Sequence, residues 1–200
     1  LREEVGERCV PMRGDVTDPD SLAAVGAEAT RRGGLHIAVA NAGRGAFAPI
    51  VDHPLEEWRS IIDLCLTGVF LTVQLAARVM VNGGSIITIS SLNATQPSAG
   101  MSAYCAAKAG VVMLTQVAAM ELGARDIRVN TIAPGLVQTH ATSAFWMVPG
   151  VVDEFIENTT LGRFPHAGDV AAMAAFLAGA ESRSVRGSLF RVRGGASPQR

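Results

Sequence analysis

A tyrosine and a lysine four residues apart form the part of this sequence best suited to chemistry. Tyr104 and Lys108 lie in a run, 102–123, whose apolar residues recur at helical spacing, so both side chains should share one helix face. A tyrosine hydroxyl has a usual pKa of about 10, and an ammonium one turn away favours the phenolate. Such a pair could take a proton from an alcohol or return one to a carbonyl oxygen. An ordinary helix with a surface Tyr and a surface Lys has the same spacing, so the pair needs support from elsewhere.

Ser91 supplies that support. The apolar, β-branched run at 86–89 is bounded by glycines and predicts a buried strand over 85–90, and Ser91 follows its C-terminal end. In open parallel sheets this end is where ligands bind. A serine hydroxyl there can hydrogen-bond a substrate oxygen as charge develops on it. We therefore expect Ser91, Tyr104 and Lys108 to converge and to exchange a proton with a substrate while hydride moves elsewhere.

These residues fall in a series of ordered motifs that resembles the short-chain dehydrogenase/reductase family. The motifs are Asn41-Ala42-Gly43, Gly84-Ser85-Ile86, Ser90-Ser91, Tyr104-x-x-x-Lys108-Ala109-Gly110 and Arg128-Val129-Asn130-x-x-x-Pro134-Gly135. The interval from Ser91 to Tyr104 is the usual one, and the resemblance runs from about Asp15 to Gly195. It implies an α/β fold with a Rossmann-like doubly wound parallel sheet, and an NAD(P)-dependent oxidoreductase. The reaction it implies interconverts a secondary alcohol and a ketone, as in 3-oxoacyl reductases or small alcohol dehydrogenases.

The resemblance also assigns catalytic roles. Tyr104 would be the general acid/base, Lys108 would lower its pKa and hold the nicotinamide ribose, and Ser91 would orient the substrate oxygen. Cys65 stands where the family has an asparagine that helps to hold a water near the lysine. The backbone carbonyl carries part of that role and survives substitution, but a thiol is a weak hydrogen-bonding group. This departure leaves a second hypothesis open, a catalytically weak or inactive binding or scaffold protein on the same fold.

The cofactor, NAD or NADP, would contact several loops at the same end of the sheet. By resemblance, Asp15-Val16 approaches the adenine ring, Asn41-Ala42-Gly43 the adenosine ribose, and Val137 and Thr139 the nicotinamide carboxamide or adjacent phosphate. Asp15 could equally be an ordinary turn residue. The complete expected set is Asp15, Val16, Asn41, Ala42, Gly43, Ile89, Tyr104, Lys108, Pro134, Gly135, Val137 and Thr139.

The order of elements predicts one dinucleotide-binding domain over 1–200 that lacks its first part. Further strands are expected at 9–13, 35–40, 126–132 and 188–192, and helices at 19–32, 54–64, 66–81 and 168–177. No glycine-rich phosphate turn precedes the strand at 9–13. We therefore expect a longer chain with about forty more residues, holding the first strand, its glycine-rich turn, the first helix and the second strand. The strand at 9–13 should then stand apart from that at 35–40 by the width of two strands.

Composition limits the possible partners. The chain has 200 residues, 48% of them hydrophobic, and a net charge of −1, which argues against a nucleic-acid or anionic-membrane partner. No uninterrupted apolar run reaches the ~18 residues of a membrane span. Three cysteines without metal spacing indicate free thiols, no metal site and a cytoplasmic location. The helices at 66–81 and 102–123 are apolar around most of their circumference, which favours a homodimer or homotetramer.

The segment 140–163 allows two interpretations. Phe145, Trp146, Met147, Val148 and Phe155 could form core beneath a long connection, or the underside of a mobile lid over the substrate. A lyase or epimerase on this fold would need further acid/base groups near such a lid. His140 and His166 are the candidates for that third hypothesis.

Overall fold

The computed structural model describes residues 6, 9–139, 142 and 150–195. They contain a four-stranded parallel sheet with the strand order β1-β2-β3-β4. The strands are β1 (Ile37–Ala40), β2 (Gly84–Ile89), β3 (Ile127–Pro134) and β4 (Leu189–Val192). The strands expected near 35–40, 85–90, 126–132 and 188–192, their parallel pairing and their order are therefore confirmed.

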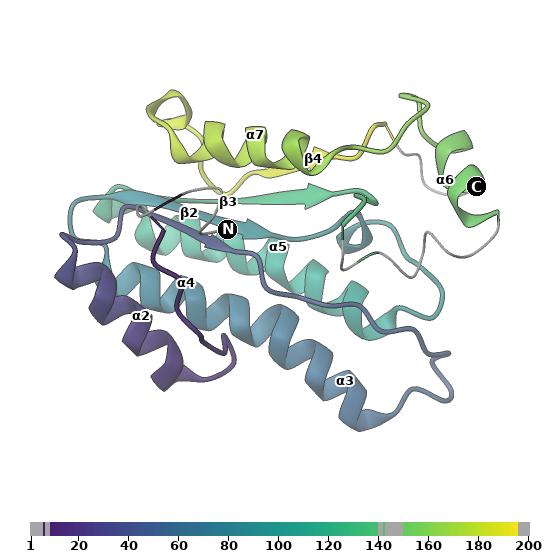
Figure 1. The fold of residues 1–200 in the computed structure, drawn as a ribbon, viewed down its shortest axis with the longest axis horizontal. Coiled ribbons are helices and arrows are strands. Elements are labelled where there is room, and N and C mark those ends of the chain that lie inside the picture. Colours follow the sequence, from purple (N-terminus) through teal and green to yellow (C-terminus); the bar gives the residue numbers. More distant parts are fainter. Residues whose placement is uncertain (1–5, 7–8, 140–141, 143–149, 196–200) are drawn as a thin grey trace.

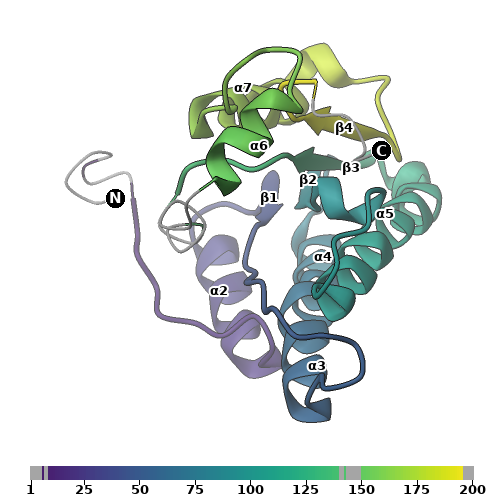
Figure 2. The same ribbon diagram turned by 90° about the vertical axis from the view of Figure 1, so that its right-hand side faces the viewer.

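Helices cover both faces of this sheet. Figures 1 and 2 show α2 (Pro19–Arg31), α4 (Gly68–Val79) and α5 (Ser102–Leu122) on one face and α7 (Ala167–Ala178) on the other. Successive strand residues point to opposite faces, so Ile86 packs with α4 and α5, whereas Ile87 packs with Leu177 of α7. Burial on both faces explains why three of the six residues of β2 are isoleucines and why its polar residues, Ser85 and Thr88, are buried with hydrogen-bond partners. The doubly wound, Rossmann-like α/β class is confirmed.

Short helical turns join these elements at both ends of the sheet. The helices predicted at 54–64 and 66–81 are present, joined by a π-helical turn that was not predicted. Such turns are often found at functional sites. The additional elements are α3 (Leu55–Ile62), the π-helical turn η2 (Asp63–Thr67), η3 (Leu92–Ala94), η4 (Gly123–Arg125), α6 (Val151–Glu157) and η6 (Ala180–Ser182).

The strand expected at 9–13 is absent, and that prediction was wrong. These residues form no strand, and no backbone hydrogen bond joins them to β1 in the part of the chain that the structure describes. Figure 2 shows the segment standing away from β1, as the expected separation requires. A strand exists only through its pairing, so an isolated extended segment does not qualify. The β1 edge is left open, with Ile37 and Val39 47% and 48% exposed.

Two helical stretches, Leu55–Val79 and Ser102–Arg125, are long and apolar enough to cross a membrane by length and composition alone. Both pack on the sheet or its flanking helices, with buried Val69, Val73 and Val111 in a shared cluster. Core helices of globular domains meet the same criterion, and packing accounts for part of the apolarity here, with 33% and 39% of the two stretches buried.

Candidate active site

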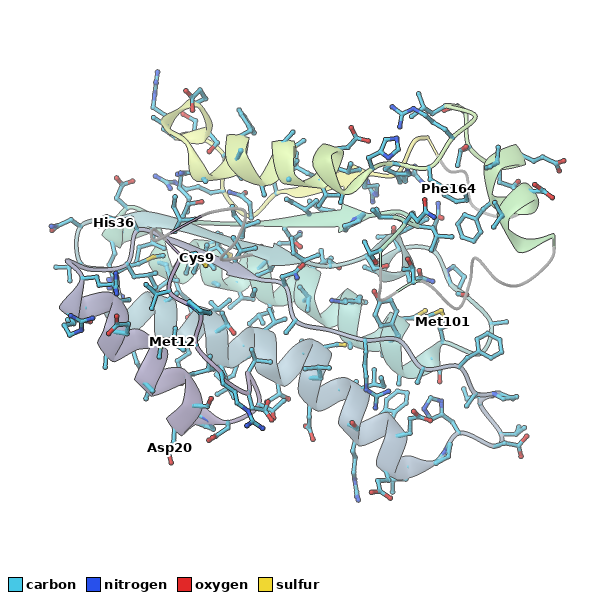
Figure 3. All side chains as sticks on the ribbon, in the orientation of Figure 1. Cys9, Met12, Asp20, His36, Met101 and Phe164 are labelled. Carbon is cyan, nitrogen blue, oxygen red and sulfur yellow. The ribbon has the colours of Figure 1, made fainter. Side chains whose placement is uncertain are left out.

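Ser91 and Tyr104 meet just beyond the C-terminal end of β2. Ser91 is buried and caps η3, accepting a hydrogen bond from the Asn93 backbone N–H on its Oγ at 3.1 Å. Its hydroxyl also lies near enough to the Tyr104 side chain to lower the pKa of that residue. Tyr104 lies in the first turn of α5, next to Met101, which Figure 3 labels toward the end of the sheet to which the strand arrows point. The structure thus brings these two predicted residues together.

Lys108 completes the group. The residue is only 3% exposed, and its ammonium donates to the Ile89 carbonyl at 2.8 Å and lies 5.6 Å from the centre of the Tyr104 ring. Ser90 donates from Oγ to the Lys108 carbonyl at 2.8 Å and so ties α5 to the end of β2. Ile89, expected beside the cofactor, here presents its carbonyl to Lys108.

The electrostatics differ from the expectation in one respect. Burial raises the pKa of Tyr104 above its usual value; the hydrogen bond with Ser91 opposes this, and Cys65 and Cys105 add to it. Burial likewise lowers the pKa of Lys108. The predicted lowering of the Tyr104 pKa by Lys108 is therefore not what this structure shows, because loss of hydration penalises the phenolate. At neutral pH Tyr104 holds its proton and is ready to donate it.

Cys65 lies beside Lys108, as its place in the family pattern implies. It is fully buried in the π-helical turn η2, and its thiol donates to the Arg44 carbonyl at 3.3 Å. A Cβ on Gly43 would lie 3.4 Å from both Cys65 Sγ and Lys108 Nζ. The lack of a side chain at Gly43 and the short side chain of Cys65 therefore leave room around the Lys108 ammonium group.

The residues expected at the adenosine end of a dinucleotide gather in one groove. Asp15, Val16, Asn41 and Ala42 line a cavity of about 290 Å³ along the open side of β1. Asp15 also accepts from the Thr17 backbone N–H and hydroxyl at 2.8 and 2.7 Å, which lowers the pKa of its carboxyl group. It is thus both a turn residue and a lining residue, so the two interpretations of Asp15 are compatible.

The residues expected at the nicotinamide end follow β3. Gly135 N–H donates to the Val192 carbonyl at 2.9 Å, just after Pro134 ends the strand. The Val137 carbonyl accepts from the Thr142 hydroxyl at 2.7 Å, and Thr139 N–H donates to the same hydroxyl at 3.0 Å. Thr142 was not predicted, although a threonine three residues after Thr139 is a usual turn-stabilising pattern.

Two more residues near the site, Asn93 and Cys105, were not predicted. Asn93 contacts Ser91 through backbone and side chain, and its amide nitrogen lies 3.9 Å from Cys105 Sγ. Both could have been suspected from their closeness in sequence to Ser91 and Tyr104.

The lid segment is only partly described. His140 and residues 145–148 lie outside the described residues. Phe155, on α6, has its ring centre 6.2 Å from that of Phe164. His166 caps α7 in a reciprocal arrangement with Asp169, its backbone N–H donating to the carboxylate at 2.8 Å. This capping gives His166 a structural role, and nothing here supports it as an acid/base group.

The arrangement fits a nicotinamide dinucleotide at two of its three parts. The groove at Asp15 and Asn41 would hold the adenosine, and Lys108, whose Nζ lies beside Gly43, would hold the nicotinamide ribose. Across residues 9–139 and 150–195 no glycine-rich turn joins a strand to a helix N-terminus as a phosphate cradle would. When bound, the nicotinamide supplies or accepts the hydride that no side chain can carry.

Comparison with known proteins agrees with this geometry. The family model described as Enoyl-(Acyl carrier protein) reductase matches residues 1–197. The chain is 41% identical over 184 residues to the 3-alpha-(or 20-beta)-hydroxysteroid dehydrogenase of Mycobacterium tuberculosis, covering 90% of this chain and 68% of that protein. It is 39% identical over 183 residues to the trans-4-hydroxycyclohexanecarboxylate dehydrogenase of Sinomonas cyclohexanicum, with the same coverage of 90% and 68%.

A solved structure extends the likeness to three dimensions. The 7 alpha-hydroxysteroid dehydrogenase complexed with NADH and 7-oxo glycochenodeoxycholic acid has a TM-score of 0.92 and 31% identity, over 98% of this chain and 78% of that one. The chain belongs to the short-chain dehydrogenase/reductase family.

Proposed function

We propose that this protein interconverts a secondary alcohol and a ketone, with NAD or NADP as the hydride carrier. The gathering of Ser91, Tyr104 and the buried Lys108, whose ammonium lies 5.6 Å from the centre of the Tyr104 ring, is the observation that carries the proposal. These are a proton donor, a hydrogen-bond donor and a fixed positive charge at one point, which is what reduction of a carbonyl oxygen needs.

Each residue has one task. In ketone reduction Tyr104 gives its proton to the substrate oxygen, and in alcohol oxidation the deprotonated Tyr104 takes that proton back. Ser91 donates a hydrogen bond to the same oxygen and holds it within reach. Lys108 offsets the negative charge of the phenolate, since an ammonium nearby favours the charged form. Asp15, Val16, Asn41 and Ala42 would hold the adenosine of the cofactor.

A cyclic secondary alcohol is the substrate class that we favour. The two curated relatives at 41% and 39% identity are named for a hydroxysteroid and a hydroxycyclohexanecarboxylate. The 3-alpha-hydroxyl of a steroid and the hydroxyl of a 4-hydroxycyclohexanecarboxylate are both carried by a saturated ring, whereas a 20-beta-hydroxyl lies on the steroid side chain.

The alternative, a weak or inactive binding protein on this fold, is favoured by one observation. The Cys65 thiol donates a hydrogen bond to the Arg44 carbonyl, and this side chain places no amide group near Lys108. A protein of this kind would bind cofactor and substrate without turnover.

Assembly and location are part of the proposal. Exposed apolar side chains on α4 and α5, Phe70, Met113, Val117 and Met120, support a contact between copies of the chain. The three cysteines are free thiols, which supports a reducing, cytoplasmic location.

The test is a substrate panel followed by nicotinamide absorbance. Purified protein is assayed with NAD⁺ and NADP⁺ on ring-borne secondary alcohols, open-chain secondary alcohols and primary alcohols. We expect turnover on secondary alcohols, fastest on the ring-borne ones. Cofactor binding by calorimetry without turnover on any alcohol or ketone would favour the binding protein. Turnover confined to primary alcohols would contradict both.

A further inference from the structure

The hydroxyl group of Ser91 is shared among three neighbours. It accepts from the Asn93 backbone N–H at 3.1 Å, and it lies near enough to Tyr104 to lower the pKa of that residue. The third neighbour is the carboxamide oxygen of Asn93, which accepts from Ser91 Oγ at 3.4 Å. The amide nitrogen of Asn93 faces Cys105 Sγ on α5 at 3.9 Å. The Asn93 side chain therefore bridges the catalytic serine and the helix that carries Tyr104.

The Ser91 hydroxyl can donate only one hydrogen bond, so its neighbours compete for it. A serine hydroxyl has one proton and two lone pairs. The Asn93 backbone N–H takes one lone pair of Ser91, because the η3 turn requires that cap. When Tyr104 is deprotonated, three acceptors compete for the single Ser91 proton: the phenolate, the substrate oxygen and the Asn93 carboxamide oxygen.

We propose that Asn93 is a positioning residue whose carboxamide oxygen holds the Ser91 proton and so limits how strongly Ser91 hydrogen-bonds Tyr104 and the substrate. The contact of 3.4 Å is long for an O–H···O hydrogen bond, so turning the Ser91 hydroxyl from Asn93 toward another acceptor costs little free energy. Its consequence for catalysis rests on the function proposed above. The competition between Asn93 and Tyr104 belongs to the protein alone and can be measured without turnover.

The competition predicts the sign of an effect on Tyr104. Without the carboxamide oxygen, Ser91 gives its proton fully to the phenolate, and a charge-assisted hydrogen bond to the ionised form lowers a pKa. The other titratable groups that face Tyr104 are Cys65 from η2 and Cys105 and Lys108 from α5. Asn93→Leu leaves these three groups in place. Apart from the contact with Ser91, the variant removes only the contact between the Asn93 amide and Cys105.

The chain offers an unusually direct measurement, because Tyr104 is its only tyrosine. The NMR signal of isotope-labelled tyrosine, followed against pH, reports this one hydroxyl, while the amide spectrum of the same sample reports folding. The variants are Asn93→Leu alone, in a Ser91→Ala background and in a Cys105→Ala background. Thr95→Val is the matched control, because the Thr95 hydroxyl lies in the same turn and donates to the Leu92 carbonyl at 3.4 Å.

We expect the titration midpoint of Tyr104 to fall in Asn93→Leu and to stay unchanged in Thr95→Val. The fall should persist with Cys105→Ala and vanish with Ser91→Ala, since it passes through the serine. A folded Asn93→Leu protein with the wild-type midpoint, or an equal fall without Ser91, would overturn the proposal. Should Asn93→Leu not fold, Asn93→Asp decides: its stronger acceptor should raise the midpoint, and by less in the Ser91→Ala background. An equal rise in both backgrounds would again overturn it.

A kinetic arm separates this proposal from the proposed function. In the enzyme assayed with NAD(P)⁺, the acid limb of kcat/KM for alcohol oxidation should move to lower pH in Asn93→Leu. A wild-type protein without turnover would count against the proposed function, while the tyrosine titration would still decide the role of Asn93.

Discussion

The Lys108 ammonium donates a 2.8 Å hydrogen bond to the carbonyl of Ile89, the last residue of β2. This bond fixes a buried charge at the end of the sheet, where Ser91 and Tyr104 also lie. It uses one of three N–H donors, and a Cβ on Gly43 would come within 3.4 Å of the same nitrogen. Lys108 is therefore held in place by the backbone and keeps its other donors for groups that approach Tyr104.

Tyr104→Phe should abolish turnover while leaving the fold intact. The ring stays in its apolar cluster, and only the hydroxyl that exchanges a proton with the substrate is lost. Loss of general acid/base help typically lowers kcat by about 10²–10⁴-fold. The measurement is nicotinamide absorbance, with cofactor affinity by calorimetry as the control for folding. Near-normal turnover in the variant would show that another group transfers the proton.

Cys65→Asn should preserve or raise turnover. The asparagine amide can replace the thiol as donor to the Arg44 carbonyl and restores the amide that the family has beside the lysine. Cys65→Ala is the matched control, because it removes the thiol and adds no amide. We expect kcat of Cys65→Asn to equal or exceed wild type and that of Cys65→Ala to fall below Cys65→Asn. A folded Cys65→Asn protein that loses most activity would show that the thiol has a role of its own.

The sequence predicted the parts of the fold that rest on local pattern. The buried strand before Ser91 and the helix with Tyr104 and Lys108 follow from apolar periodicity, and both have close to the expected bounds. The prediction of a strand at 9–13 was wrong, because an apolar pattern indicates a tendency to form a strand but not whether a neighbouring strand is present to pair with it. The π-helical turn at Asp63–Thr67 has no periodic signal and was missed for that reason.

The sequence predicted which residues form the site better than it predicted how they interact. Motif spacing brought Ser91, Tyr104 and Lys108 together, but it could not show that burial raises the pKa of Tyr104. Burial depends on packing from η2 and α3, elements distant in sequence. Likewise, Asn93 and Thr142 act through hydrogen bonds across turns whose geometry the sequence alone did not reveal.

Arg128→Met should destabilise the protein without touching the site. The Arg128 guanidinium is buried and donates to the Leu177 carbonyl at 2.7 Å and the Gly179 carbonyl at 3.1 Å, so it caps the end of α7. Its removal leaves several carbonyls without their charged donor, and each such hydrogen bond is worth about 1.5–3 kcal/mol. We expect the free energy of unfolding in urea to fall by about 2–4 kcal/mol.

Arg186→Met is the control for that change. Arg186 donates to Asp126 at 2.8 Å, but the pair is open to solvent, and such pairs contribute about 0–1 kcal/mol. Equal losses from the two substitutions would show that burial of Arg128 is not what makes it important.

Stability at alkaline pH should depend on Tyr104 in the direction set by its raised pKa. An unfolded tyrosine titrates near pH ~10, whereas the folded protein holds this proton more tightly. The stabilisation is therefore full below pH ~10 and is lost as pH rises through the folded-state pKa. Lys108 acts oppositely: its lowered pKa means that stability rises with pH between the folded value and the usual 10.5. Urea unfolding on both sides of pH ~10 should show a steeper alkaline loss in wild type than in Tyr104→Phe. Parallel curves would contradict the raised pKa.

The exposed apolar face of α4 and α5 should hold copies of the chain together. Met120 is 84% exposed, and Met113, Val117 and Phe70 are exposed on the same two helices, although methionine and phenylalanine side chains gain by burial. Light scattering at micromolar concentration should give a dimer or tetramer. Met113→Glu with Met120→Glu should shift the protein toward monomer, because each carboxylate would have to lose its water in the contact. Val51→Glu is the control, since Val51 is equally exposed at 85% but lies on the connection before α3. A monomeric wild-type protein would contradict the contact. Equal dissociation by Val51→Glu would show that the contact lies elsewhere.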